Sequence, residues 1–186
     1  MKKILFSDAF FSKDRLYRYA LWRIWDNELP KVLFIGLNPS TADEVKDDPT
    51  IRRCIRYALD WGYGGYIMGN IFAYRSTDPK QLKIIDNPIG IDNNYWLKKL
   101  HTEASLTIGA WGNHGKYLNR GQDIINLIDN LFCLRMTKEG HPSHPLYLSS
   151  KLKPIKLGKR SGAAPQSSRY TSFDRMKNAK SLDDIF

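Results

Sequence analysis

Polar side chains able to hold a ligand or move a proton are concentrated at four points of the 186-residue chain. Three of the points follow an apolar run, and one lies within such a run. The four are Asn38 in Gly36-Leu37-Asn38-Pro39-Ser40-Thr41, Asn70 in a second run, residues 111–114 after a third, and residues 141–147 after a fourth. An amide presents a donor beside an acceptor, and a neutral imidazole presents one of each. These side chains can therefore form hydrogen bonds with a ligand and transfer protons.

The first of these points shows how such side chains are positioned. Residues 32–35 are four consecutive apolar residues, a pattern typical of a buried strand of parallel type. Gly36 permits close approach of the backbone, and Pro39 fixes its own φ and keeps Asn38 out of the helical region. A polar loop is thus held at the carboxyl end of a buried strand, where open α/β sheets bind ligands.

The elements that carry the four points alternate along the chain. Helices are predicted at 12–25 with Ser12 as N-cap, from Asp48-Pro49-Thr50 to Gly62, at 92–104 and at 119–130. Strands are predicted at 32–36, 65–72, 104–111 and 131–136. This order predicts an α/β fold, a three-layer αβα sandwich with a central four-stranded parallel sheet. Because the carboxyl ends of parallel strands meet at one edge, we expect the four points to share a cleft.

The charge of the chain is concentrated at its end. We expect one α/β domain over 1–150 and a basic, partly flexible tail over 151–186, in which the spacing of Phe173, Met176, Ala179 and Leu182 predicts a short helix. The tail holds nine Lys or Arg against three Asp and so supplies +6 of the net charge of +10. Such a tail raises affinity for polyanions, and a solvated, solubilising tail is the alternative interpretation.

Other features limit the class of protein. Cys54 and Cys133 lie on apolar patterns without Cys-x-x-Cys spacing, so both are predicted to be buried thiols. The four histidines have no ligand spacing with carboxylates or thiols, so no metal and no cofactor is expected. No apolar stretch approaches the roughly 20 residues that span a bilayer. The apolar segment near the N-terminus is too short for the apolar region of a signal peptide. We expect a cytoplasmic protein that does not bind membranes.

The order and type of the four points resemble the uracil-DNA glycosylase superfamily. That superfamily has a Gly-x-Asn-Pro or Gly-Gln-Asp-Pro motif after strand one, an Asn on strand two, Trp-Gly after strand three and His-Pro-Ser-Pro-Leu after strand four. Gly36-Leu37-Asn38-Pro39 is most similar to its mismatch-specific branch. The longer string Leu37-Asn38-Pro39-Ser40-Thr41-Ala42-Asp43 resembles a family of small, mostly uncharacterised bacterial and phage proteins, over about residues 12–150.

The resemblance implies a role for each matching residue. Asn38 would hold the attacking water and contact the base with Gly36 and Leu37, Asn70 would recognise the base edge, and His141 or His144 would donate to the base O2. Phe72 or Tyr74 would stack on the flipped base, and Leu146 or Tyr147 would enter the gap left in the duplex. The residues expected to contact nucleic acid besides these are Ser40, Thr41, Lys138 and Ser143.

The chain departs from that pattern at two places. The efficient uracil enzymes carry a water-activating Asp in the first motif, where this chain has Asn38; Asp43, Glu44, Asp47 or Asp48 are the carboxylates near enough in sequence to replace it. The fourth motif has an extra residue, so His141 and His144 both match it. On pattern alone, the Asn38 segment is also typical of an ordinary turn and Asn70 of a buried amide with satisfied hydrogen bonds.

Three hypotheses follow. The first is a DNA glycosylase that flips out and excises a damaged, mismatched or modified pyrimidine from double- or single-stranded DNA. The second keeps the fold but makes the protein a module that binds a base or nucleic acid without cutting it. The third is an N-glycosidase or transferase that acts on free nucleotides or on RNA.

Overall fold

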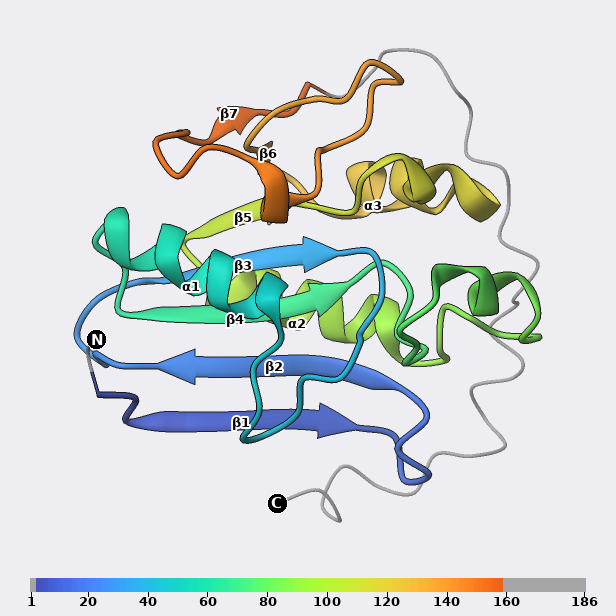
Figure 1. Cartoon of the computed structure of the whole chain (residues 1–186), viewed down its shortest axis with the longest axis horizontal. Helices are drawn as coiled ribbons and strands as arrows, with labels where there is room; N and C mark the ends of the chain where they lie inside the picture. The colour runs from blue at the N-terminus through green and yellow to red at the C-terminus, as the bar shows by residue number, and fades with distance from the viewer. Residues whose placement is uncertain (1–2, 159–186) are drawn as a thin grey trace.

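The computed structural model describes residues 3–158 and contains one mixed β-sheet of seven strands with helices on both faces (Figure 1). The order across the sheet is β1-β2-β4-β3-β5-β6-β7. The strands are β1 Phe6–Phe11, β2 Arg18–Ile24, β3 Lys31–Gly36, β4 Gly65–Asn70, β5 Leu106–Gly109, β6 Leu131–Cys133 and β7 Ile155–Lys156. The α-helices are α1 Pro49–Asp60, α2 Asn93–Glu103 and α3 Arg120–Leu127, and short 3-10 helices lie at Pro79–Lys83 (η1), Asn113–Asn119 (η2) and Pro145–Tyr147 (η3).

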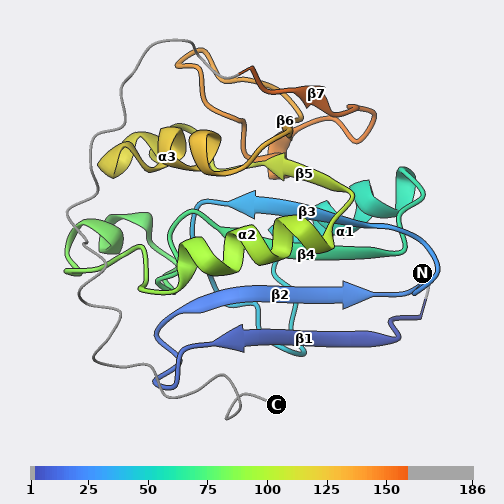
Figure 2. The same ribbon diagram turned by 180° about the vertical axis from the view of Figure 1, so that it is seen from behind.

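Four neighbouring strands of this sheet, β4, β3, β5 and β6, run parallel. Side chains of β3 alternate between the two faces, as the pleat requires. Val32 and Phe34 pack in the cluster that includes α1, whereas Leu33 and Ile35 pack in the cluster that includes α2 and α3. Figures 1 and 2 show α1 on one face of the sheet and α2 on the other. The predicted α/β class is confirmed.

Helix α1 begins and ends where the sequence predicts. The side chain of Asp48 accepts a hydrogen bond from the backbone N–H of Ile51 at 2.8 Å, and Pro49 takes the first helical position. The chain leaves the helix at Gly62, which has a φ of +81°. The Asp48 cap determines where α1 begins, and its first turn lies beside the carboxyl end of β3.

Residues 12–25 do not form the predicted helix, and this prediction is wrong. They form a turn and then β2, which pairs antiparallel with β1 and with β4. Ser12 closes the turn: its backbone N–H donates to the carbonyl of Tyr17 at 2.9 Å, and its Oγ accepts from the N–H of Tyr17 at 3.0 Å. Because β2 is covered on both faces, its buried aromatic and aliphatic side chains lack the simple alternation of a half-exposed strand.

The expected sheet of four strands is too small. The N-terminal hairpin adds β1 and β2 at one edge, and β7 adds an antiparallel strand beside β6 at the other. Ile155 and Lys156 of the predicted basic tail thus belong to the sheet, and the next residue, Leu157, is buried. The predicted helix at 173–182 lies outside the described residues. Over residues 3–158, no helix has the length and apolar character needed to cross a membrane.

Candidate functional site

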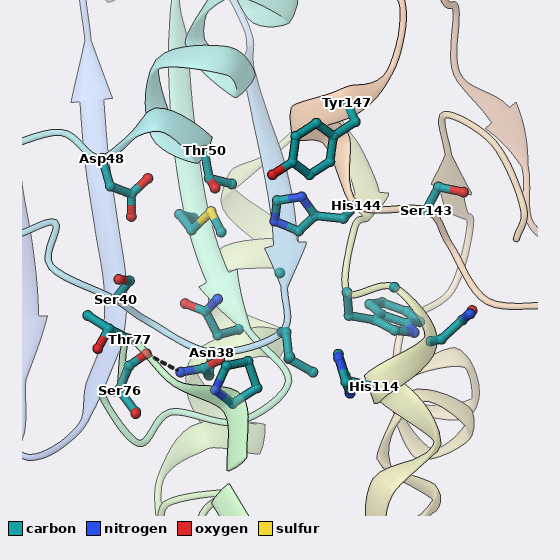
Figure 3. A pocket seen from close by; sticks show the side chains of 18 of the residues that line it. Asn38, Ser40, Asp48, Thr50, Ser76, Thr77, His114, Ser143, His144 and Tyr147 are labelled. Atoms are coloured by element: carbon teal, nitrogen blue, oxygen red, sulfur yellow. Dashed lines mark hydrogen bonds between the residues drawn. The ribbon is translucent and has the colours of Figure 1, made fainter. Parts of the chain in front are cut away.

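A cleft of about 550 Å³ opens at the carboxyl ends of the parallel strands (Figure 3). Its walls come from the loops that follow β3, β4, β5 and β6, from the first turn of α1 and from the start of β2. The predicted site residues that line it are Gly36, Leu37, Asn38, Ser40, Asn70, Ser143, His144 and Tyr147. These residues belong to the first, second and fourth of the polar points. The third point also lines the cleft, through Trp111, Gly112, Asn113 and His114, so the structure brings all four points together.

Asn38 joins two of the loops that form the cleft. Its Nδ2 donates to the carbonyl of Ser76 at 2.8 Å (Figure 3). The same nitrogen donates to the carbonyl of Pro39 at 3.1 Å. Ser76 follows β4, so one side chain holds the loops after two adjacent strands. Both amide hydrogens are used in this way, and the amide oxygen is the group that Asn38 has left for a ligand.

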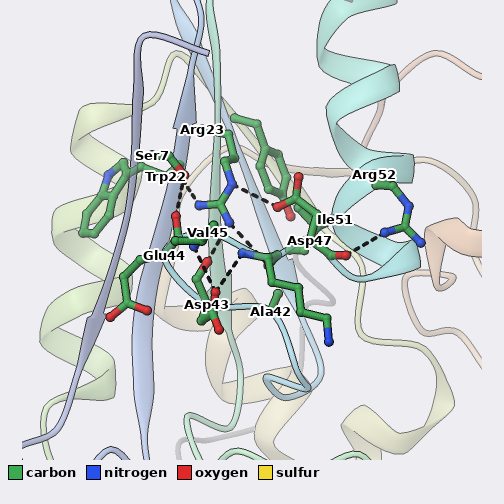
Figure 4. Close-up of polar contacts among 12 residues, drawn as sticks. Ser7, Trp22, Arg23, Ala42, Asp43, Glu44, Val45, Asp47, Ile51 and Arg52 are labelled. Atoms are coloured by element: carbon green, nitrogen blue, oxygen red, sulfur yellow. Dashed lines mark hydrogen bonds and ion pairs between the residues drawn. The ribbon is translucent and has the colours of Figure 1, made fainter. Parts of the chain in front are cut away.

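Arg23 of β2 holds the loop between β3 and α1 (Figure 4). Its Nη2 donates to the carbonyl of Asp43 at 2.6 Å, and its Nε pairs with the Asp47 carboxylate at 2.9 Å. Glu44 pairs with Arg15 at 2.8 Å. Of the four carboxylates named as substitutes for the absent Asp, these three are held outside the cleft, and Asp48 lines it.

Asn70 is fixed at the floor of the cleft and is only 1% exposed. Its Oδ1 accepts a hydrogen bond from Nη2 of Arg18 at 3.3 Å, whereas its Nδ2 is buried and donates to no atom of the described protein. The backbone carbonyls of Asn70 and Ile71 accept from Nδ2 of Asn93 at 3.0 Å each. The end of β4 is therefore tied to α2, and both hydrogens of Asn70 Nδ2 are left for a ligand.

Arg18 brings a positive charge to the same floor. It is 1% exposed, its Nη1 donates to the carbonyl of Ala42 at 2.8 Å, and its Nε has no acceptor among the described residues. Burial lowers the pKa of Arg18 to about 10, and the nearby groups Tyr66 and Asp48 act in the opposite direction. The guanidinium is still protonated at neutral pH, so the cleft favours a ligand with acceptor atoms or negative charge.

His144, and not His141, lines the cleft. Nδ1 of His144 accepts from the backbone N–H of Leu146 at 3.4 Å, which caps η3. An accepting Nδ1 carries no proton, so the neutral ring has its proton on Nε2. Burial lowers the pKa of His144, and the carboxylate of Asp48 opposes this shift. His144 is thus an uncharged donor at neutral pH, whereas His141 lies in a hairpin turn with Thr137.

The opposite wall is formed by residues after β5 and β6. Trp111 is 1% exposed, its Nε1 has no acceptor among the described residues, and its ring fills the space that Gly115 leaves by lacking a Cβ. Gly112 has a φ of +69°, so the chain turns there at the edge of the cleft. Arg135 is an exposed cation at the rim of the cleft.

Several predicted site residues lie elsewhere. Phe72 is fully buried and packs on Tyr117 with ring centroids 5.7 Å apart, and Tyr74 packs on Tyr17 at 5.7 Å. Neither lines the cleft as a stacking surface. The others that do not line it are Thr41, Lys138, His141 and Leu146. Tyr147, in contrast, is 89% exposed at its rim.

Other residues of the cleft were not predicted from the sequence. Arg18 lies in a segment that was predicted to be a helix, Thr50 was considered only as part of a helix start, and no pattern indicated Ser76, Thr77 or Arg135. The signal that identifies Thr50 and Asp48 is the helix start itself, since the first turn of α1 follows a loop that begins at the carboxyl end of β3.

The described residues hold no group of three or more His, Cys, Asp or Glu side chains suited to a metal ion. A family model described as a protein of unknown function, DUF1643, matches residues 18–146. The match runs from the start of β2 into η3 and includes every cleft residue except Tyr147 and Leu148. No curated protein and no solved structure is found to be similar.

Proposed function

The chain belongs to the DUF1643 family, and we propose that its cleft binds a pyrimidine base flipped out of DNA and hydrolyses the N-glycosidic bond of that base. The observation that carries the proposal is that two uncommitted donors on different elements line the cleft: Nδ2 of Asn70, buried without an acceptor among the described residues, and Nε2 of His144. Uracil and thymine have carbonyl acceptors on two sides of the ring, O2 and O4, so two donors fixed on different elements suit them. The volume of about 550 Å³ is within the range of small-ligand pockets.

Cleavage of an N-glycosidic bond develops positive charge on the sugar and negative charge on the departing base. Fixed donors at the base oxygens stabilise that negative charge without reorganisation during the reaction. His144 would donate to O2 and Asn70 to O4. The buried charge of Arg18 on the same floor favours the anionic base over the neutral one.

The hydrolytic step also needs a group that accepts a proton from water. Asn38 cannot do this, because a neutral amide is a negligible base. Asp48 lines the cleft and uses its Oδ1 on the N–H of Ile51, which leaves Oδ2 for a water. Water attacks C1′ of the sugar, the C1′–N1 bond breaks with its electron pair going to the base, and Asp48 accepts the proton. The base leaves as its N1 anion and takes up one proton, which balances the proton that Asp48 then gives up, so the products are a free base and an abasic site.

The rim of the cleft suits contact with a nucleic acid strand. Tyr147 presents an exposed ring and Arg135 an exposed cation, and the whole chain has a net charge of +10. Aromatic stacking and phosphate contacts are the general means by which proteins offset the few kcal/mol that base flipping costs.

A base-release assay tests this function. The protein is incubated with duplex and single-stranded oligonucleotides that carry uracil, mismatched thymine or modified pyrimidines, and alkali then cleaves any abasic site. We expect cleavage that is lost in His144→Ala and retained in His141→Ala, because His144 lines the cleft and His141 does not. Retained cleavage in His144→Ala contradicts the assigned donor.

One observation favours a second function, that of a base-binding module without catalysis. Both amide hydrogens of Asn38 are bound to loop carbonyls, as expected of a residue whose task is to hold the loop. The same assay separates the two functions. Specific binding of uracil-containing DNA with no abasic product on any substrate would support the binding module.

A further inference from the structure

We infer that Arg18 determines which pyrimidine the cleft accepts, because it fixes the amide of Asn70 in one of its two orientations. The inference rests on the proposed function in one respect, that the ligand is a pyrimidine base. It assigns to the N-terminal hairpin, which lies outside the parallel part of the sheet, the residue that sets base specificity.

An asparagine amide by itself has no preference between its two orientations. Turned by 180°, it exchanges a donor for an acceptor at the same position, so an unrestrained Asn accommodates a carbonyl or an amino group equally well. A site that discriminates between uracil and cytosine through Asn70 must therefore prevent this turn. The neighbours of the side chain decide whether it does.

Arg18 restricts Asn70 to one orientation. Nη2 of Arg18 lies 3.3 Å from Oδ1 of Asn70, and a guanidinium can only donate hydrogen bonds. The reversed amide would place its NH2 against the NH2 of Arg18, with two donors facing each other in a buried site. Arg18 cannot move away easily, because its other terminal nitrogen donates to the carbonyl of Ala42 at 2.8 Å.

The fixed orientation has a chemical consequence. Nδ2 of Asn70 has no acceptor among the described residues and belongs to a residue that lines the cleft, so a ligand beside it must present an acceptor there. Uracil and thymine present the carbonyl O4, and their N3–H can donate to the remaining lone pair of Oδ1. Cytosine presents an amino group at the same place, which meets the NH2 of Asn70 donor against donor. Arg18 thus makes the cleft selective for 4-keto pyrimidines.

Two substitutions at one position test this assignment. Arg18→Met removes the donors and the charge, whereas Arg18→Lys removes the contact geometry but keeps a group that only donates. Arg23→Met is the matched control, because Arg23 is an equally buried arginine of the same strand that does not line the cleft. Thermal melting shows that each variant is folded before it is compared.

The measurement is the ratio of the equilibrium affinities for free uracil and free cytosine. A correctly matched pair of hydrogen bonds to a base discriminates by about 10- to 100-fold. We expect a ratio in this range for the wild type, Arg18→Lys and Arg23→Met, and a ratio below about 3 for Arg18→Met. A ratio that is unchanged in Arg18→Met overturns the inference, as does equal affinity for both bases in the wild type.

This experiment is independent of catalysis. A wild type that prefers uracil and loses the preference in Arg18→Met, but releases no base from any oligonucleotide, supports the inference and contradicts the glycosylase. A wild type that excises uracil and cytosine at equal rates supports the glycosylase and contradicts the inference.

Discussion

We assign two functions to Asp48, helix capping and proton acceptance, and two substitutions separate them. One carboxylate oxygen caps α1 by accepting from the N–H of Ile51 at 2.8 Å, and the side chain also lines the cleft, where it is the proposed base. Asp48→Asn keeps an oxygen in the same place, since Asn and Asp are equally good N-caps, but an amide cannot accept a proton from water. Asp48→Ala removes both functions.

The stability effect follows from the cap. Loss of an N-cap side chain costs about 1 kcal/mol, which lowers the Tm of a domain of this size by about 2–4 °C. We therefore expect this decrease for Asp48→Ala and a change below about 1 °C for Asp48→Asn. The effect on catalysis is different, because general-base catalysis contributes roughly 10²- to 10⁴-fold. Both variants should lose base release by a factor in that range.

The assay combines thermal unfolding with single-turnover release of uracil from a duplex oligonucleotide, measured on the same protein samples. A wild-type rate in Asp48→Asn would refute Asp48 as the base. A Tm that falls equally in Asp48→Asn and Asp48→Ala would refute the account of the cap. The change in Tm and the change in the rate of base release are independent of each other, so the results test the cap and the general base separately.

Three further outcomes are expected. Burial holds the pKa of His144 below its ordinary value of 6.5. A proton on Nδ1 removes the acceptor of the Leu146 N–H that orients the ring, so base release should fall only as the pH drops below about 6.5. His144→Gln, which keeps an uncharged donor, should lose this acid limb, and an unchanged limb in the variant contradicts the assignment. A Cβ on Gly36 would lie 2.9 Å from Nδ2 of Asn70, so Gly36→Ala should weaken uracil binding at least tenfold at a stability cost of about 1–3 kcal/mol; calorimetry and denaturant unfolding measure the two effects. Burial raises the pKa of both Cys54 and Cys133, so neither thiol should react with a thiol reagent until the protein unfolds.

The sequence predicts the parallel part of the sheet well because its signals are local. A four-residue apolar run specifies β3, and Asp48-Pro49 specifies the start of α1 through one cap and one fixed φ. These elements lie where the cleft forms, so the positions of Asn38, Asn70 and His144 follow from the order of the strands. Both buried thiols were predicted for the same reason.

The N-terminal hairpin was not predicted because its structure depends on contacts far along the chain. The segment 12–25 contains residues that suit either a helix or a strand, and pairing of β2 with β4, more than 40 residues later, decides between them. Arg18 consequently had no recognisable role in the sequence. The buried rings of Phe72 and Tyr74 show the converse: the sequence identifies aromatic residues beside a site but not the direction in which each ring points.

The cleft draws its side chains from almost the whole described chain, from Arg18 in β2 to Leu148 after η3. A ligand that contacts them binds the assembled domain and has no corresponding site on the unfolded chain. Its binding free energy is therefore added to the free energy of unfolding, by about 2.7 kcal/mol at a concentration 100 times the Kd. For a domain of this size that raises the Tm by about 5–10 °C. Melting temperature thus reports occupancy of the cleft even in variants that carry out no reaction.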